Sequence, residues 1–497
     1  MTIASQGASP SPVTGDDTRA FRVEQRGTDF VPEDQRWARP RDLFAMWCSS
    51  SLQFEYLIYG AVLMTFGFSF AQAAVLIVVG NLSYLLLGLC SLQGPETGTT
   101  VFVIGRAAYG PNGSRIMATF NWLTQVGFET EGLTLATLAA VALAAKAGWH
   151  TTTGTKVIII VAAAAVQGVL PLFGHASIIK ALRVLIAPFM VLYVILAVLT
   201  VHKAHLSAPA HGVGWQTIVV GMTFVITLSG LGWVENGNDF SRYLPRQSSK
   251  PAILGWVLAG AAIPQVVVML LGAAVATYVP SAAGDPVHNF PHAFAAWFLV
   301  PFLVVAIMQV FAISSLDLYS SGVTLQAIGL PLRRWQAVLL DTVIAAGLTA
   351  YAVFSSSFNT LLSDFVSLVV AWIAPWMAVF LVDWALRRYR YVPGELQRTD
   401  PGSLYWRSGG IHWPAIMAQV LGSAVALLSI NTNFYVSPLS HATDGADFSI
   451  LAGVVVAGAA YALIGGRGVR RQADLQDQLL EVPALGPTDL QDRSGRS

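Results

Sequence analysis

The stretch that decides the fold is LGWVENGNDFSRYLP, residues 231–245, because it follows a largely apolar run at 215–229 and is itself crowded with polar groups. The apolar run suits a membrane-spanning helix, which needs about 20 mostly apolar residues. Two acids, Glu235 and Asp239, follow in the same segment. Lipid offers no hydrogen bonds, so polar groups and irregular backbone at this depth are tolerated only inside protein or beside water. The stretch therefore predicts a membrane helix that is broken near Gly230 and Gly232 and whose polar end continues to the membrane surface.

The composition of the whole chain agrees with a protein that lies in a membrane. Of its 497 residues, 55% are hydrophobic and only 11% are charged, against about 25% charged in typical soluble proteins. Cys48 and Cys90 fall in apolar segments, so buried thiols are expected rather than a disulfide or a metal site. The chain is expected to be an all-α polytopic membrane protein with 12 transmembrane helices, at 44–68, 70–92, 116–145, 155–173, 183–201, 215–234, 252–279, 296–328, 336–354, 361–384, 415–433 and 448–465.

The distribution of Lys and Arg predicts the orientation of these spans. With the N-terminus in the cytoplasm, 25 of the 28 Lys and Arg residues fall on the cytoplasmic side, and Lys146, Lys156 and Lys203 on the other. Cytoplasmic loops carry an excess of these residues, so a multi-pass plasma-membrane protein with both termini cytoplasmic is expected. Neither tail shows an apolar pattern, and both are expected to be flexible. The predicted parts are an N-terminal tail, two repeats, a two-helix segment and a C-terminal tail, at 1–40, 41–200, 201–390, 391–466 and 467–497.

Two of the predicted spans contain residues that interrupt a helix. The first span holds SSSLQFE at 49–55, and the sixth holds Gly230 and Gly232. These interruptions lie roughly 177 residues apart, and the acids Glu131 and Asp317 of the third and eighth spans are 186 apart. Paired interruptions in corresponding halves point to a transporter binding site, so we expect two five-helix repeats, with two further helices appended. The alternative is that these glycines only allow close packing of helices.

Four acids are predicted at mid-membrane depth. Each would cost about 2.5–3.5 kcal/mol at a helix centre exposed to lipid, so they must face protein or water, or be protonated. Ionisable residues at this depth are by default functional candidates, although each could also make a structural hydrogen bond to a neighbouring helix. The four are Glu55, Glu129, Glu131 and Asp317.

Helical geometry separates these acids, at 100° per residue. If Phe128 faces a cavity, Glu131 and Gln125 flank it, whereas Glu129 points sideways and is expected to brace another helix. Phe128 and Trp233 lie on different spans, and two such rings could hold a flat solute between them. The alternative is that either ring belongs to the packed interior.

Several segments resemble one known family. GLGWVENGNDFSRYLP at 230–245 is similar to the sixth-helix signature of the nucleobase–cation symporter family, in its purine/cytosine permease branch. GPETGTTVFVIGRAAYG at 94–110 resembles the loop between the second and third helices of that branch. LYSSGVTLQAIG at 318–329 resembles its eighth helix, and WCSSSLQFEYLIYG at 47–60 its first helix more loosely. The resemblance covers about residues 40–465.

This resemblance implies a five-plus-five inverted repeat of the LeuT type with two extra C-terminal helices, which works by alternating access. It implies a substrate held between the first, third, sixth and eighth helices, and a coupling cation between the first and the eighth. The family's two sandwiching aromatics fall on Phe128, where Trp is common, and on Trp233. The family's eighth-helix asparagines correspond here to Ser314, Ser315 and Asp317, which puts the substrate range in doubt.

The predicted site residues form three groups. Those expected to bind substrate are Trp233, Phe128, Gln53, Gln125, Glu131, Ser314 and Asp317. Those expected to couple the cation are Ser49, Glu55, Ser314, Ser315 and Asp317. A gating or structural pair is expected between Asp239 and Arg242, which are three residues apart on a helix.

The function expected is therefore a secondary active transporter that imports cytosine or a purine in symport with H⁺ or Na⁺. No cofactor is expected beyond the coupling cation. The expected partners are the nucleobase and the lipid bilayer, with no nucleic acid, and the sequence does not indicate an oligomeric state. Alternatives are another flat heterocycle, such as allantoin, a hydantoin or a vitamin, or a passive channel. An enzyme is not expected, because the chain contains no HExxH, GxSxG or Walker motif, and Pro291 separates His288 from His292.

Overall fold

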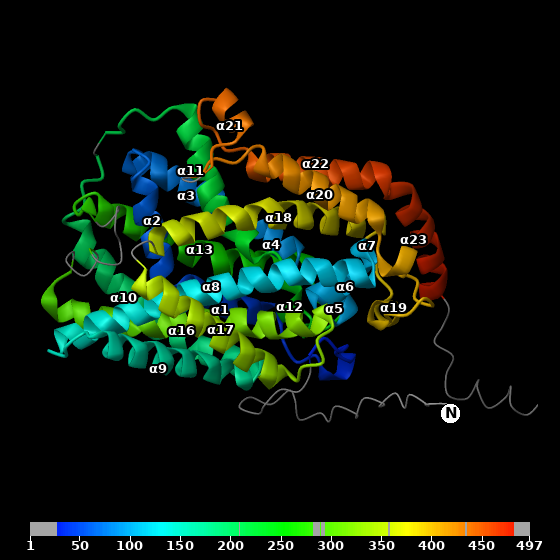
Figure 1. Ribbon diagram of the computed structural model, residues 1–497, viewed down its shortest axis with the longest axis horizontal. Coiled ribbons are helices and arrows are strands. Elements are labelled where there is room, and N and C mark those ends of the chain that lie inside the picture. The colour runs from blue at the N-terminus through cyan, green and yellow to red at the C-terminus, as the bar shows by residue number, and fades with distance from the viewer. Residues whose placement is uncertain are drawn as a thin grey trace, which may run out of the picture.

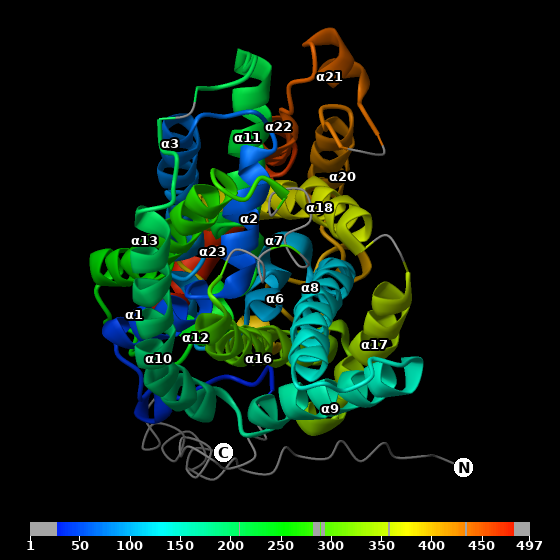
Figure 2. The ribbon, with the colours of Figure 1, turned by 90° about the vertical axis from the view of Figure 1, so that its left-hand side faces the viewer.

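The structure is a computed structural model that describes residues 27–207, 209–281, 289, 294–355, 358–432 and 435–481. Within these ranges the chain is helical, and the only β pairing is an isolated bridge between Asn431 and Val436. Long helices run side by side through the molecule, with α8, α18, α20 and α22 lying across Figure 1. Figure 2 shows the same bundle turned by 90°. The predicted all-α class is confirmed.

The first half of the chain contains η2 (Glu33–Gln35), α1 (Pro40–Ser51), α2 (Phe54–Met64), α3 (Phe70–Asn81), α4 (Tyr84–Leu89), α5 (Gln93–Thr97), α6 (Val101–Ile104), α7 (Arg106–Tyr109), α8 (Pro111–Lys146), α9 (Thr153–Leu172) and α10 (His175–Val201). The second half contains α11 (Trp215–Thr227), η3 (Gly230–Trp233), α12 (Gly237–Ser241), α13 (Lys250–Ala276), α16 (Ala296–Ile328), α17 (Arg334–Phe354), α18 (Phe358–Leu386), α19 (Pro393–Gln397), η4 (Ser408–Gly410), α20 (Trp413–Leu427), α21 (Pro438–Ala442), α22 (Ser449–Ile464) and α23 (Gly466–Glu481).

The membrane spans account for most of these helices. In the described part of the chain, ten helical segments are long and apolar enough to cross a membrane. Helices α22 and α23, which are joined at a bend, form an eleventh candidate if they are counted as one span. The remaining predicted span is the first, which is divided into α1 and α2, each too short to cross alone. The chain therefore has the helices expected of a five-plus-five inverted repeat with two appended spans.

The first span is broken where the sequence predicted it. Helix α1 ends at Ser51 and α2 begins at Phe54, and Gln53 between them is extended, with φ −139° and ψ 158°. Serine side chains compete for backbone hydrogen bonds and so weaken a helix; Ser50 Oγ donates to the Trp47 carbonyl at 3.0 Å. The break leaves backbone polar groups inside the bundle rather than against lipid.

The sixth span is broken just after α11, at Ser229, whose φ of −115° and ψ of −128° are not helical. Side chains from α13 and from the turn between α3 and α4 satisfy the freed backbone: Gln265 Nε2 donates to the Leu228 carbonyl at 3.1 Å, and Ser83 Oγ accepts from Gly230 N at 3.0 Å. A Cβ at Gly230 would lie 2.2 Å from the Ser83 backbone. Glycine is therefore required here for the break to approach the turn between α3 and α4.

Close backbone contact also holds α2, the second half of the first span, in place. A Cβ at Gly60 of α2 would lie 1.9 Å from the Met269 carbonyl oxygen, and a Cβ at Gly272 of α13 would lie 1.9 Å from that of Leu57. Small residues permit such approach between membrane helices. This contact fixes the position of α2, which carries several side chains of the candidate site.

Three features differ from the sequence-based expectation. The second span is divided by a turn at Leu82–Ser83. Helix α10 begins at His175, eight residues before the predicted start, so Lys180 and Arg183 lie in a helix and not in a loop. The predicted flexible tail from 467 begins with helix α23, which meets α22 at 67°. Val469 and Ala473 are buried on one side of α23. The many charged residues of this helix made its apolar side hard to recognise in the sequence.

Candidate functional site

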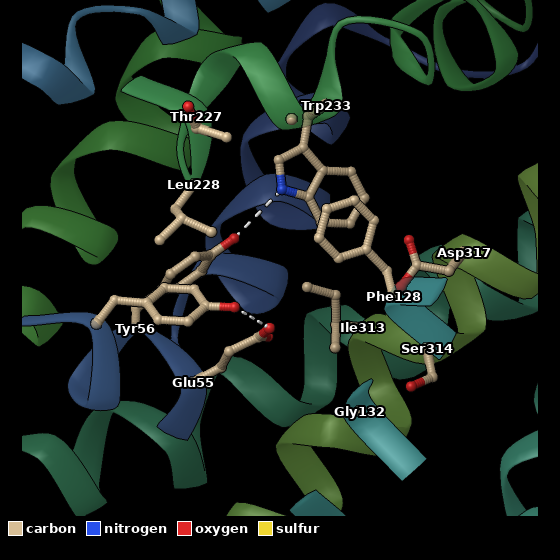
Figure 3. Close-up of a pocket in the computed structure, with 12 residues that line it drawn as sticks. Glu55, Tyr56, Phe128, Gly132, Thr227, Leu228, Trp233, Ile313, Ser314 and Asp317 are labelled. Atoms are coloured by element: carbon tan, nitrogen blue, oxygen red, sulfur yellow. Dashed lines mark hydrogen bonds between the residues drawn. The ribbon is translucent and has the colours of Figure 1, made fainter. Parts of the chain in front are cut away.

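A cavity lies where the two broken spans meet the third and eighth spans (Figure 3). The space inside it that a water-sized group can occupy is about 30 Å³, well below the roughly 300–1,000 Å³ usual for small-molecule sites, so the lining must move apart to admit a flat ring. Helices α2, α8, α11, η3 and α16 contribute the lining, which consists of Glu55, Tyr56, Tyr59, Phe128, Gly132, Thr227, Leu228, Gly232, Trp233, Ile313, Ser314 and Asp317.

Phe128 and Trp233 are the aromatic groups that the third and sixth spans bring to this cavity (Figure 3). Each is held edge-on by another ring: Phe128 by Phe365, with centroids 5.2 Å apart, and Trp233 by Trp47, with centroids 5.4 Å apart. Trp233 Nε1 also donates to Tyr56 Oη at 3.3 Å. Both side chains are thus fixed from outside the cavity, and their remaining surfaces line it.

Asp317 and Ser314 are the polar groups that α16 contributes. The Asp317 side chain is only 5% exposed and lines the cavity, and it makes no hydrogen bond or ion pair within the described residues. Ser314 Oγ is likewise buried without a partner there. Gly132 of α8 lets the two helices approach at this point, since its Cβ would lie 2.9 Å from Ser314 Oγ. A buried polar group normally has a partner, so these two are suited to bonding a solute.

On the α2 side, two acids meet one tyrosine. Tyr59 Oη lies 2.5 Å from Glu55 Oε1 and 2.6 Å from Glu131 Oε1. Glu55 and Tyr59 line the cavity, whereas Glu131 lies behind Tyr59 and is 3% exposed. The first and third spans are therefore joined by a carboxyl–hydroxyl–carboxyl contact beside the cavity.

Besides Glu131, four residues predicted to bind substrate or cation lie outside the cavity lining. The Gln125 amide donates to Asn236 Oδ1 at 2.8 Å and so joins the third span to the sixth. The Gln53 side chain and Ser49 Oγ are buried without hydrogen-bond partners in the described structure. Ser315 Oγ donates to the Ala312 carbonyl at 2.6 Å. Direct contact of these four with a solute in this cavity would require a rearrangement.

The predicted pair of Asp239 and Arg242 is corrected by the structure: these two described residues form no ion pair with each other. Asp239 Oδ1 accepts from the Val101 amide at 3.0 Å. Arg242 donates to the Gly27 carbonyl at 2.6 Å and to Tyr319 Oη at 2.8 Å. The short helix α12 ends at Ser241, so the two side chains diverge and join different segments.

Tyr56 and Tyr59 are the two aromatic residues among the lining residues that the sequence analysis did not select. Aromatic residues at helical spacing in a membrane span more often belong to the packed interior. For this reason the sequence did not single out Tyr56 and Tyr59 as site residues. The one available signal was the spacing of Tyr59 four residues after Glu55, which places both on the same face of α2.

His288 and His292, the two histidines four residues apart, lie outside the described residues. Within the described ranges, no group of three or more His, Cys, Asp or Glu side chains is arranged to hold a metal ion. Cys48 and Cys90 are buried free thiols, as expected.

A cavity between two broken spans and two long helices is the architecture of a secondary transporter. The family model described as permease for cytosine/purines, uracil, thiamine and allantoin matches residues 30–453. The chain therefore belongs to this permease family and is a transporter rather than an enzyme.

Relatives with similar sequences carry related names. The Bacillus subtilis (strain 168) protein YxlA, whose name assigns it provisionally to the purine-cytosine permeases, is 23% identical over 474 residues, covering 92% of this chain and 99% of YxlA. The purine-cytosine permease FCY21 of Saccharomyces cerevisiae is 23% identical over 446 residues, covering 84% of this chain and 81% of the yeast protein.

Solved structures confirm the fold. The chain is similar to Mhp1, a nucleobase-cation-symport-1 family transporter, in a closed conformation with bromovinylhydantoin bound, with a TM-score of 0.72 and 18% identity over 90% of this chain and 96% of Mhp1. The inward-facing conformation of Mhp1 gives a TM-score of 0.68 with the same identity and coverage. A substrate-bound, outward-open Na⁺-coupled sialic acid symporter matches at 0.56, with 12% identity over 88% of this chain and 93% of that one. The predicted inverted-repeat fold is thereby confirmed.

Proposed function

We propose that this transporter imports an uncharged planar heterocycle of the nucleobase type in symport with a proton. The observation that carries the proposal is the position of Phe128 and Trp233 on two different spans, both lining one cavity together with the unpartnered carboxyl of Asp317. Two rings can hold the faces of a flat solute, and Asp317 can accept hydrogen bonds from N–H groups on its edge.

The charge of the cavity restricts the solute. None of the described residues that line it is Lys, Arg or His, whereas Glu55 and Asp317 are acids. An anionic solute would therefore meet like charge in a medium of low dielectric constant, where repulsion is strong. This argues for a neutral heterocycle with N–H donors. Hydantoins remain the second candidate, because Mhp1, which shares the fold, was solved with a bromovinylhydantoin.

The transport cycle proposed is alternating access, in which the substrate and the proton favour one of two arrangements of the bundle. One end of the bundle is closed in this structure. Tyr243 Oη and Tyr319 Oη lie 3.0 Å apart, Arg242 donates to Tyr319, and the Ala38 amide donates to the Tyr243 carbonyl at 3.1 Å. These contacts join the segment before α1 to the sixth and eighth spans and must separate when this end opens.

The distribution of positive charge supports the orientation proposed. Arg242 and Tyr319 lie at the end of the bundle where the sequence places most of its Arg and Lys. We therefore propose that this end is cytoplasmic, that both termini lie there, and that the protein resides in the plasma membrane. The repeats proposed are residues 41–200 and 201–390.

Transport by the purified protein in proteoliposomes tests this proposal. Radiolabelled cytosine, adenine, hypoxanthine, uracil, allantoin and a benzyl-substituted hydantoin would each be offered, with sodium or choline outside and with or without an inward proton gradient. We expect at least one neutral heterocycle to accumulate when the proton gradient is imposed, in choline as well as in sodium. Uptake that stops at equilibrium under every ion gradient would instead indicate a passive channel.

Replacing Asp317 with asparagine is expected to change which heterocycles compete. Asparagine presents N–H donors as well as an acceptor, and hydrogen bonds to a charged group are worth about 1.5–3 kcal/mol. Competitors that offer N–H groups should therefore bind about tenfold or more weakly, while those that offer carbonyl oxygens should lose less. Inhibition constants for the panel above measure this change.

Asp341→Asn is the matched control, because it makes the same substitution away from the cavity, where Asp341 accepts from Trp122 Nε1 at 2.8 Å and Ser321 Oγ at 2.6 Å. The order of competitors should be unchanged in this variant. An unaltered order in Asp317→Asn as well would exclude Asp317 as a substrate ligand.

A further inference from the structure

We infer that Glu55, Tyr59 and Glu131 form the proton-binding site of this transporter, an inference that rests on the proposed function. The site lies beside the substrate cavity, where Tyr59 Oη contacts Glu55 Oε1 at 2.5 Å and Glu131 Oε1 at 2.6 Å. Glu55 and Tyr59 belong to α2, the part of the first span beyond its break, and Glu131 belongs to α8. A proton bound here thus joins a broken span to an unbroken one.

The donors and acceptors determine how many protons the cluster holds. A tyrosine hydroxyl has one O–H to donate, and an ionised carboxylate has none. If both carboxyls were ionised, Tyr59 could donate to only one of them. The other would set a charged oxygen against the hydroxyl lone pairs at a separation of about 2.5–2.7 Å, which is typical of O–H···O⁻ hydrogen bonds. One of the two carboxyls must therefore carry a proton, which it can donate to Tyr59 Oη or to the other carboxylate.

Among the described residues that line the cavity beside the cluster, no cation is present to neutralise two carboxylates. Glu131 is only 3% exposed, and its second oxygen, Oε2, has no hydrogen-bond partner within the described structure. The further acid that faces the cluster is Asp317, across the cavity on α16. No Lys, Arg or His lies among the described lining residues. Charge balance at this position therefore depends on a bound proton.

The same geometry explains how the proton would be coupled to movement. Loss of the proton leaves two like charges on either side of Tyr59, in a medium where their repulsion is strong. That repulsion drives α2 away from α8, whereas the protonated cluster holds the two together. Because the proton prefers one arrangement of the helices, it shifts the equilibrium between them. The substrate lies against the same α2 residues, so each ligand favours the binding of the other.

The test compares two transport modes of the full-length protein in proteoliposomes: substrate counterflow, which needs no net proton movement, and accumulation driven by an imposed proton gradient. Glu131→Gln keeps the side-chain shape and supplies a permanent N–H donor in place of the bound proton. We expect counterflow to persist and proton-driven accumulation to be lost. Glu129→Gln is the matched control, since Glu129 is buried on the same helix without a bond to Tyr59, and this variant should still accumulate substrate.

Proton-driven accumulation that persists in Glu131→Gln would overturn the inference, as would equal loss in Glu129→Gln. Accumulation by the unmodified protein that follows a sodium gradient and ignores a proton gradient would overturn it too. A second measurement needs neither a substrate nor transport: infrared spectra of the purified protein over a pH titration should show a protonated-carboxyl band that Glu131→Gln and Tyr59→Phe each remove or shift. An identical band in both variants would exclude the shared proton. Absence of any counterflow with this band intact would instead count against the proposed function.

Discussion

Replacing Trp233 with alanine is expected to lower uptake at low substrate concentration by about 5- to 150-fold, because one aromatic face is worth about 1–3 kcal/mol of stacking. The indole lines the cavity and is held in place by Trp47 and by its hydrogen bond to Tyr56. Alanine removes both the stacking face and this support. Initial rates of uptake in proteoliposomes, normalised to the amount of inserted protein, measure the effect.

Two further variants separate a binding role from a general loss of structure. Trp149→Ala is the matched control, since Trp149 is 67% exposed and far from the cavity lining, and its uptake should remain at the unmodified level. Phe128→Ala removes the second ring without disturbing the break of the sixth span and should also reduce uptake. Normal transport in Trp233→Ala would refute the sandwich of Phe128 and Trp233 as the substrate site.

The two breaks could be predicted from sequence because their causes are local. The serines before Gln53 and the glycines at 230 and 232 weaken a helix whatever surrounds them. The structure places the breaks after Ser51 and at Ser229, within a few residues of the expected positions. The composition and the Lys and Arg pattern likewise sufficed for the helical class, because each span must satisfy its backbone within lipid.

The residues of the cavity were harder to predict, for a physical reason. A helical projection holds only within one continuous helix, and the extended Gln53 resets the direction of every side chain after it. Tyr56 and Tyr59 therefore line the cavity in place of Gln53. On the unbroken α8, Phe128 lines the cavity as the projection assumed, yet Glu131 lies behind Tyr59 and Gln125 is held by Asn236 of the sixth span. Such partners across helices are invisible in a single sequence.

The second large effect is expected far from the cavity, at a buried ion pair. Arg387 Nε donates to Asp383 Oδ2 at 2.8 Å, with both side chains 0% exposed, and Tyr461 Oη donates to Asp383 Oδ1 at 2.7 Å. Asp383→Ala leaves a buried guanidinium without its carboxylate, which typically costs about 3–5 kcal/mol. The midpoint of thermal unfolding of the detergent-purified protein should therefore fall markedly.

The double variant Asp383→Leu with Arg387→Met distinguishes the cost of an unpaired charge from the worth of the pair itself. Replacing a buried ion pair by apolar residues of similar volume is often neutral or stabilising by about 1–4 kcal/mol, and Arg387 Nη1 has no hydrogen-bond partner in the described part of the protein. We expect the double variant to recover most of the lost thermal stability. Arg387 Nη2 also donates to the Ala107 carbonyl at 2.8 Å, which joins α18 to α7. If the double variant unfolds as early as Asp383→Ala, this connection to α7, rather than charge balance, is what stabilises that end of the bundle.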